Sequence, residues 1–295
     1  MQLLDGKHVS QKIKEGLKKQ VEKLVHQGQR PPHLAAVLVG NNGASETYVA
    51  NKVKSCKEAG FQSTFIRLGE NTTEPELIAV VEKLNADENI DGILVQLPLP
   101  ASIDEYKIID AISPNKDVDG FHPVNTGKML LCDDDAFLPA TPFGILLLLE
   151  HYNITTTGKR VVVLGRSNIV GRPISILMGQ QRPYGNATVT LCHSQTPNIE
   201  EITLQADILI SAIGKPASIT ASMVKEGAVV IDVGIIRVKD ETSATGYKIK
   251  GDVDFETVAP KCSFITPVPG GVGPMTIAAL MTNTIKAYSL SVQKP

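Results

Sequence analysis

The stretch "RVVVLGRSNIVGRP" (160–173) decides the fold of this chain. An uninterrupted apolar run ends at Gly165, and a second glycine, Gly171, opens a segment with helical spacing of its apolar residues. Apolar runs without polar alternation are typical of parallel strands that are covered on both faces. The stretch therefore predicts a strand, a tight turn and the start of a helix.

The same alternation of strands and helices extends along the whole sequence. Apolar runs predict strands at 34–40, 63–68, 92–100, 160–165, 187–192, 207–214 and 228–234. Helical spacing predicts helices at 9–24, 45–59, 75–85, 141–153 and 275–289, and another after Gly171. This βα order predicts an α/β fold with two doubly wound domains, the second of Rossmann type. We expect the last helix to pack back on the first domain.

Composition excludes several classes of protein. The chain has 295 residues, a net charge of −2 and no run of like charge, so nucleic acid and anionic membranes are poor partners. The apolar stretch "ILLLLE" is too short to span a bilayer, and the N-terminus lacks the features of a signal peptide. Four scattered cysteines without a C-x-x-C pattern predict reduced thiols in the cytoplasm and no metal site.

The glycine turn after the strand at 160–165 is a candidate nucleotide-binding turn. It departs from the G-x-G-x-x-G pattern, because Ser167 replaces the second glycine and Gly171 comes one place late. A helix N-terminus at this point would still favour a diphosphate, through free N–H groups and the helix dipole. The alternative is an ordinary strand-to-helix turn without a ligand.

The end of the next strand, "TLCHSQT", indicates which dinucleotide is bound. NAD-binding proteins usually place Asp or Glu there for the ribose 2′-hydroxyl, whereas this chain has Cys192, His193 and Ser194. No carboxylate would repel a 2′-phosphate, and Arg166 could pair with one, so we predict NADP. Alternatively, Arg166 is a solvated turn charge and His193 a partly buried residue.

Three polar residues near the first sheet are candidates for chemistry. Tyr48 and Lys52 are four residues apart on a predicted helix and so share a face. Gln96 lies near the C-terminal end of the apolar strand "GILVQLPLP", where ligands gather in open α/β sheets. Gln96 and Lys52 could meet there. The alternatives are a chance pairing on the helix and an amide that bonds local backbone.

Two loops complete the candidate site. The polar loop "SPNKDVDGFHPVN" (113–125) contains Asp119 before Gly120, which suits either a turn or a carboxylate that binds an amino-substituted heterocycle. The segment "TPVPGGVGPMT" (266–276) holds three glycines and three prolines. Such residues fix an unusual backbone path and permit a close approach.

Together these motifs resemble one family. "TYVANKVKSC", "VQLPLP", "PNKDVDGFHPVN", "GRSNIVGRP" and "TPVPGGVGPMT" occur in the order and spacing of the bifunctional methylenetetrahydrofolate dehydrogenase/methenyltetrahydrofolate cyclohydrolases, and the likeness runs from Leu4 to Ala287. One departure is "MGQQRPYGNATVT", which is a few residues longer than usual. We expect this longer 178–187 passage to affect, if anything, the adenosine end of the cofactor site.

The resemblance implies roles for individual residues. Lys52 would be the catalytic lysine, Tyr48 would stack on the folate, and Gln96 would hold and tune the lysine. Asp119 would grip the pterin ring. Further substrate contacts would be Leu97, Gly270, Gly271 and Pro274, with the turn from Pro269 to Thr276 lining a cleft between the domains and Pro274 starting the last helix. Cofactor contacts would be Gly165, Arg166, Ser167, Ser194 and Ile235.

The resemblance also implies an activity and an organisation. NADP-dependent oxidation of 5,10-methylenetetrahydrofolate would precede hydrolysis to 10-formyltetrahydrofolate, in one-carbon metabolism that serves purine, methionine and histidine biosynthesis. Residues 1–140 and 270–295 would form the folate-binding catalytic domain, and 141–269 the NADP-binding domain. A homodimer would form through the cofactor domain, with 235–250 as a projecting hairpin. The alternatives are a monofunctional dehydrogenase and a Rossmann-type binding protein without activity.

Overall fold

A computed structural model describes residues 1–243 and 246–292. The chain divides into two compact units. The three-stranded unit comprises Gln11–Ala140 and the chain from Ile277 on, and the six-stranded unit comprises Met1–Ser10 and Thr141–Thr276. Three long helices, α1 (Gly6–His26), α6 (Ala140–His151) and α10 (Val272–Val292), each contribute residues to both units. The end of the expected catalytic domain, 293–295, lies outside the described residues.

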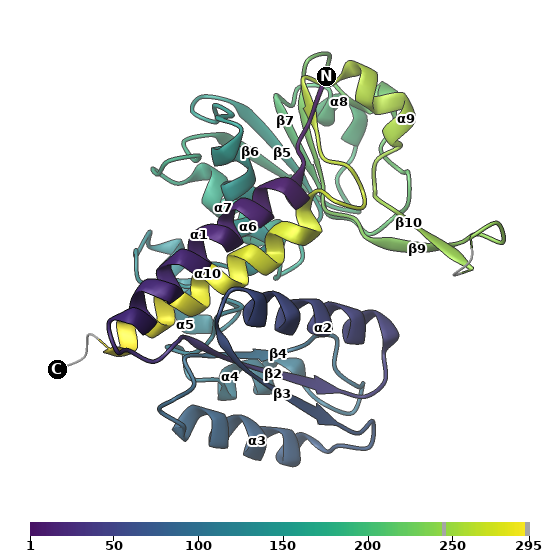
Figure 1. The fold of residues 1–295 in the computed structure, drawn as a ribbon. Coiled ribbons are helices and arrows are strands. Elements are labelled where there is room, and N and C mark those ends of the chain that lie inside the picture. Colours follow the sequence, from purple (N-terminus) through teal and green to yellow (C-terminus); the bar gives the residue numbers. More distant parts are fainter. Residues whose placement is uncertain (244–245, 293–295) are drawn as a thin grey trace. The chain divides into compact units, whose positions relative to one another are not determined.

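The three-stranded unit is a small parallel α/β layer. Its strands run in the order β3 (Gln62–Leu68), β2 (His33–Val39) and β4 (Gly92–Val95), and every residue of β2 is buried. Helix α2 (Gly43–Glu58) covers one face and α3 (Glu74–Ala86) the other (Figure 1). The apolar face of α3 packs on strand residues such as Val37 and Ile93. Two shorter helices follow, α4 (Glu105–Ala111) and α5 (Pro123–Leu130).

The six-stranded unit is built on one parallel sheet. Within the described residues its strands run β1 (Gln2–Leu3), β11 (Phe264–Ile265), β8 (Val229–Asp232), β7 (Ile208–Ser211), β5 (Arg160–Leu164) and β6 (Thr188–Cys192). The connecting helices are α7 (Gly171–Gly179), α8 (Ile199–Thr203), α9 (Phe255–Val258) and the 3₁₀ turns Ala221–Met223 and Ala259–Lys261. The prediction of two α/β layers with a Rossmann-type second one is confirmed.

The N-terminus lies in a different unit from the one expected. Gln2 and Leu3 pair with Phe264 and Ile265, so the first ten residues belong to the six-stranded unit. The pairing supplies main-chain hydrogen bonds that a two-residue strand could not satisfy alone. The C-terminal helix belongs to the three-stranded unit from Ile277 on, where Asn283 donates to the carbonyls of Val118 and Leu138.

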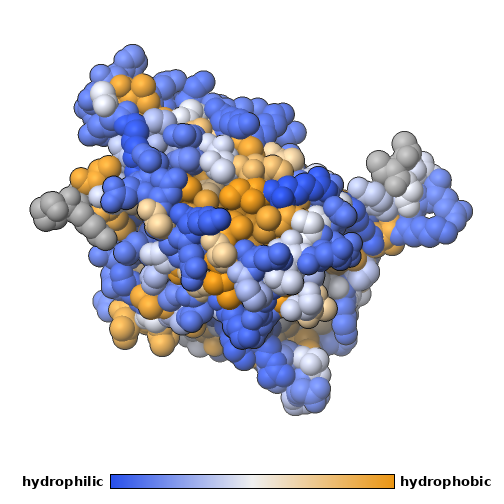
Figure 2. Space-filling model, turned by 90° about the horizontal axis from the view of Figure 1, so that it is seen from below, coloured by the Kyte–Doolittle hydropathy of each residue, from blue (hydrophilic) through white to orange (hydrophobic). Residues whose placement is uncertain are grey.

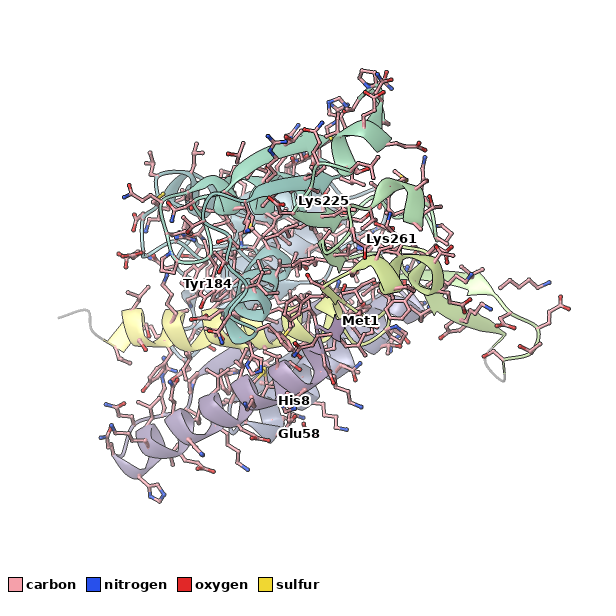
Figure 3. All side chains as sticks on the ribbon, turned by 90° about the horizontal axis from the view of Figure 1, so that it is seen from above. Met1, His8, Glu58, Tyr184, Lys225 and Lys261 are labelled. Carbon is pink, nitrogen blue, oxygen red and sulfur yellow. The ribbon has the colours of Figure 1, made fainter. Side chains whose placement is uncertain are left out.

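The longer passage after α7 lies at the amino ends of the strands and not at their carboxyl ends, where its influence was expected. Helix α7 runs back from the carboxyl end of β5, so residues 180–187 precede β6. The Thr156 hydroxyl donates to the Gly185 carbonyl and the Gly158 amide donates to that of Asn186, both just before β5. Tyr184, labelled in Figure 3, belongs to this passage. The expected influence on the adenosine end of the site is therefore wrong.

The predicted hairpin is present. Strands β9 (Ile236–Lys239) and β10 (Tyr247–Lys250) pair antiparallel, and the ribbon extends away from the six-stranded sheet (Figure 1). Part of its connection, 244–245, lies outside the described residues. Of the helices that the structure describes, none is long and apolar enough to cross a membrane. Figure 2 shows a face dominated by hydrophilic residues, with hydrophobic residues gathered near its middle.

Candidate active site

Lys52 and Gln96 form the centre of the candidate site in the three-stranded unit. The Lys52 ammonium on α2 donates to Gln96 Oε1 at 3.1 Å, and only 5% of Lys52 is exposed. Gln96 is the first residue beyond β4 and is half-buried, so the strand is shorter than predicted. Its Nε2 donates to the Leu97 carbonyl at 2.6 Å. The amide therefore bonds local backbone and the lysine together, which fixes its orientation.

Asp117, rather than Asp119, makes the turn in the loop 113–125. The buried Asp117 carboxylate accepts from the amides of Gly120, Phe121 and His122 and from the Asn125 side chain. The predicted loop ends in a helix, because α5 begins at Pro123 with His122 as its cap. Within the described residues no hydrogen bond reaches the Asp119 carboxylate. Asp117 thus orders the loop and leaves Asp119 available to a ligand.

Asp119 lies within electrostatic reach of Lys52. Burial raises the pKa of the Asp119 carboxyl above its ordinary value, the Lys52 ammonium lowers it, and the Asp117 carboxylate raises it. A carboxylate and an ammonium on neighbouring segments can bind the donor and acceptor groups of a polar heterocycle. Tyr48, one helical turn before Lys52, and Leu97, directly after Gln96, are both half-buried. Five predicted substrate residues, Tyr48, Lys52, Gln96, Leu97 and Asp119, thus belong to a single unit.

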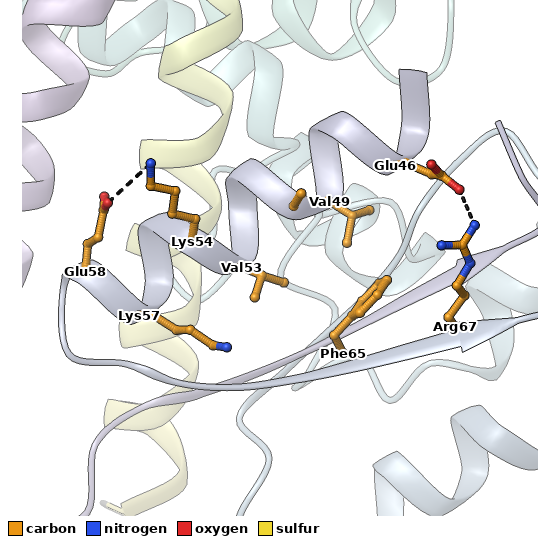
Figure 4. A pocket seen from close by; sticks show the side chains of 9 residues that line it. Glu46, Val49, Val53, Lys54, Lys57, Glu58, Phe65 and Arg67 are labelled. Carbon is orange, nitrogen blue, oxygen red and sulfur yellow. Dashed lines mark hydrogen bonds and ion pairs between the residues drawn. The ribbon is translucent and has the colours of Figure 1, made fainter. Parts of the chain in front are cut away.

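A groove of about 570 Å³ on the same unit lies apart from these residues. Val49, Val53 and Phe65 line it, and Glu46 pairs with Arg67 and Lys54 with Glu58 at its margin (Figure 4). Tyr48, Lys52, Gln96 and Asp119 do not line it. Nothing in the sequence pointed to this groove, and we assign it no chemistry.

The glycine turn at 266–271 packs closely against the start of α1, within the six-stranded unit. A Cβ atom on Gly6 would lie 1.8 Å from the Gly271 carbonyl oxygen, and Lys7 donates its amide to Gly270. Gly270 has a φ of 112°, which side chains disfavour. The close approach therefore includes the start of α1. Helix α10 begins at Val272, so Pro274 lies in its first turn rather than at its first residue.

The turn after β5 has the geometry of a nucleotide-binding turn. Gly165 has a φ of 106°, and a Cβ on Gly171 would lie 1.9 Å from the Gly165 carbonyl oxygen. The Ser167 hydroxyl accepts from the amides of Val170 and Gly171 at 3.2 and 3.3 Å. Ser167 therefore satisfies amides at the start of α7, which explains why the turn needs no glycine there.

A pocket of about 430 Å³ opens beside this turn, in the six-stranded unit. It is lined by the ends of β5, β6 and β7, including Gly165, Arg166, His193, Ser194 and Lys215. None of its lining residues is Asp or Glu. Ligands of open α/β sheets bind beyond the carboxyl ends of the strands, where this pocket lies. Ile235, which is 45% exposed and follows β8, does not line it.

Sequence reasoning missed the buried carboxylates of the six-stranded unit. Asp232, at the end of β8, and Asp252, after β10, are 3% and 0% exposed. In the sequence, Asp232 stands at the end of an apolar run and Asp252 follows a glycine. Neither position indicates that the two carboxylates lie close together. Among the described residues, no group of three or more His, Cys, Asp and Glu could hold a metal.

Both units match the domains of one family. Residues 4–119 match the catalytic domain of tetrahydrofolate dehydrogenase/cyclohydrolase, and residues 139–292 match the NAD(P)-binding domain of the same enzymes. The chain belongs to the tetrahydrofolate dehydrogenase/cyclohydrolase family. The family resemblance drawn from the motifs is confirmed, and the Lys52–Gln96 contact lies in the segment that matches the catalytic domain.

Relatives in this family match the whole chain. The bifunctional protein FolD of Cytophaga hutchinsonii is 59% identical over 290 residues, which cover 98% of this chain and 100% of the relative. The crystal structure of the bifunctional FolD of Campylobacter jejuni is 49% identical, has a TM-score of 0.92 and covers 98% of this chain and 99% of its own. The Trypanosoma brucei FolD, solved with NADP and an inhibitor, is 37% identical, with a TM-score of 0.93 and 98% of each chain covered.

Proposed function

We propose that this enzyme catalyses two consecutive reactions of tetrahydrofolate. In the first, 5,10-methylenetetrahydrofolate loses a hydride to NADP⁺, which gives 5,10-methenyltetrahydrofolate and NADPH. In the second, water adds to the methenyl carbon, the ring opens, and 10-formyltetrahydrofolate and a proton are released. The first reaction needs the one-carbon unit held in place, and the second needs a group that moves protons.

The contact between Lys52 and Gln96 carries this proposal. Lys52 is a buried amine whose ammonium contacts a neutral amide acceptor, within electrostatic reach of Asp119. A buried amine that one amide acceptor holds in place can carry a proton to or from a bound substrate. Asp119 would bind the amino-pterin edge, and Tyr48 and Leu97 would contact the folate. Contacts from Gly270, Gly271 and Pro274 stay predictions.

The pocket beside Gly165 fits NADP by its charge. Its lining contains Arg166 and Lys215 and no acid. Arg166 and Ser194 would hold the 2′-phosphate, while Gly165, Ser167 and Ile235 would contact the rest of the dinucleotide. When bound, NADP⁺ accepts the hydride. A carboxylate at the end of β6, expected for NAD, is missing, since Cys192, His193 and Ser194 stand there.

One assay separates the bifunctional enzyme from its two alternatives. The purified protein is given 5,10-methylenetetrahydrofolate with NADP⁺ or NAD⁺, and reduced nicotinamide and methenyl-folate are followed together. We expect NADPH to form and methenyl-folate to be consumed. NADPH formation with methenyl-folate left to hydrolyse at its uncatalysed rate would indicate a monofunctional dehydrogenase. Binding of NADP without any absorbance change would contradict the proposed activity.

The assembly and its setting are also proposals. Two-stranded ribbons are marginal alone, and β9–β10 carries Ile236, Val238 and Ile249 without a third strand within the described residues. We propose that the hairpin contributes to a homodimer, which sedimentation of the full chain would test. A cytoplasmic enzyme that supplies 10-formyl groups for purine, methionine and histidine biosynthesis would be consistent with its chemistry.

A further inference from the structure

The nucleotide pocket contains a cation that the family resemblance did not assign. Lys215 follows β7 and lines the pocket together with Arg166, His193 and Ser194. Its side chain is exposed, and in the part of the chain that the structure describes neither Lys215 nor Arg166 forms an ion pair. Two unpaired cations in a pocket without acids create a site for a dianion.

A buried carboxylate fixes the backbone that carries Lys215. Asp252 Oδ1 accepts the amide of Lys215 at 3.0 Å, and Oδ2 accepts the amide of Ile213 at 2.8 Å and the hydroxyl of Ser211 at 3.0 Å. Asp252 is fully buried. Two amides of this loop and the hydroxyl that precedes it all donate to one buried carboxylate, so Asp252 fixes the position of the Lys215 backbone.

Asp252 is held in turn by a second buried carboxylate. Asp232 accepts the amides of Gly234, Asp252 and Val253, each at 2.9 Å. Two glycines leave room for the pair: a Cβ on Gly251 would lie 1.9 Å from Asp232 Oδ2, and one on Gly234 would lie 2.5 Å from Asp252 Oδ1. The two carboxylates therefore tie together the segments that follow β7, β8 and β10.

From this arrangement we propose that Lys215 determines cofactor specificity together with Arg166, and that Asp252 is the residue that positions it. Lys215 supplies a second cation for the 2′-phosphate of the dinucleotide, and Asp252 acts through the loop without touching the cofactor. The proposal rests on the proposed use of NADP. It adds a contact on the β7 side of the pocket to those expected on the β5 and β6 sides.

The test compares two nucleotides that differ only by the 2′-phosphate. Dissociation constants of NADPH and NADH are measured by nucleotide fluorescence for the wild-type chain, Lys215→Met and Lys159→Met. Lys159 is an exposed lysine just before β5, at the opposite edge of the sheet, so its substitution changes the net charge equally. We expect Lys215→Met to weaken NADPH about tenfold and NADH little, since a charged hydrogen bond is lost. An unchanged NADPH/NADH ratio, or an equal change in Lys159→Met, would overturn the proposal.

A second variant tests the positioning role. Asp252→Asn keeps the side chain's size but turns an N–H donor toward one of the three groups that Asp252 accepts. We expect a lower NADPH/NADH selectivity in the wild-type background and little further loss of selectivity in Lys215→Met, because both substitutions act on the same contact. Equal weakening of NADPH and NADH, or an additive loss of selectivity, would show that Asp252 is only a scaffold residue. If Asp252→Asn does not fold, Ser211→Ala is measured instead, because it removes one donor to the same carboxylate. The same two outcomes then decide the positioning role.

Failure of this proposal differs from failure of the proposed function. If the wild-type chain binds NADPH tightly and Lys215→Met has the same NADPH/NADH selectivity, the role of Lys215 is overturned while the enzyme assignment stays intact. A wild-type chain that shows no preference between NADPH and NADH contradicts the choice of NADP itself.

Discussion

The ammonium of Lys52 lies 3.1 Å from Oε1 of Gln96, although 44 positions separate the two residues in the sequence. Gln96 also donates to the Leu97 carbonyl, so its carbonyl oxygen cannot turn away from the lysine without breaking a second hydrogen bond. This amide orients a buried amine and supplies no charge that would neutralise it. Only the second of the two proposed reactions requires proton transfer by a side chain. The Lys52–Gln96 pair should therefore matter more for the second reaction than for the first.

Replacing Lys52 should separate the two activities. Lys52→Met keeps much of the stem's bulk and removes the amine, so we expect cyclohydrolase activity to fall about 10²–10⁴-fold while some dehydrogenase activity survives. NADPH formation and methenyl-folate hydrolysis are measured separately. Lys54→Met, an exposed lysine on the same helix, is the matched control and should change neither rate much. Full cyclohydrolase activity in Lys52→Met would contradict the mechanism.

Removing the partner of Lys52 should act in the same direction. Gln96→Ala leaves the Lys52 ammonium without its amide acceptor, so we expect cyclohydrolase activity to fall by at least about tenfold and methenyl-folate to accumulate. The ratio of the two rates, followed in one cuvette, is the measurement. A fall in the dehydrogenase alone would place Gln96 in hydride transfer instead.

The two aspartates of the loop 113–125 should behave oppositely when replaced. The Asp119 carboxylate accepts no hydrogen bond within the described residues, so Asp119→Ala should raise the KM for folate strongly and barely change the thermal midpoint. Asp117 accepts four hydrogen bonds while buried, so Asp117→Ala should lower stability by roughly 2–4 kcal/mol. Thermal melts and folate kinetics on both variants decide this. A large loss of stability in Asp119→Ala with normal folate binding would return Asp119 to a structural role.

Arg166 should contribute to the choice of NADP. Arg166→Ala removes a charged partner of the 2′-phosphate, which typically contributes about 1.5–3 kcal/mol, or one to two decades of affinity. Titration with NADPH and NADH would show the loss for NADPH alone. Equal losses for both nucleotides would mean that Arg166 does not recognise the 2′-phosphate.

The stability of the protein should carry a pH dependence from Asp232. Burial raises the pKa of this carboxyl to about 6, above its ordinary value of 3.8, and the Asp252 carboxylate adds to the shift. Between these two values the folded state holds more protons at this site than the unfolded state. Stability from this group is therefore lost as the pH rises through that window. We expect the free energy of unfolding of Asp232→Asn, relative to wild type, to rise by on the order of 1–3 kcal/mol between about pH 4 and pH 7. Urea titrations across this range measure it, and a pH-independent difference would contradict the shift.

The sequence by itself was enough to predict most strands and helices and to identify the family motifs. Runs such as 160–165 and the helical spacing at 9–24 depend on neighbouring residues, because strand and helix periods are local. The glycine turn at Gly165 was predicted for the same reason, since a positive φ is a property of one residue. Short segments without a period, such as β1 and β11, left no signal.

Only the tertiary structure decided which side chains meet. Helix α7 carries the chain back across the sheet, so the 178–187 passage lies far from the strand ends where the sequence had placed its influence. Asp252 reaches the amides of Ile213 and Lys215, almost forty residues earlier, because the hairpin returns the chain to the carboxyl ends of β7 and β8. The aspartates at 117 and 119 look alike in sequence, and burial with four hydrogen bonds makes one a turn former and leaves the other free. Such distinctions depend on desolvation and on partners distant in sequence, which no local pattern contains.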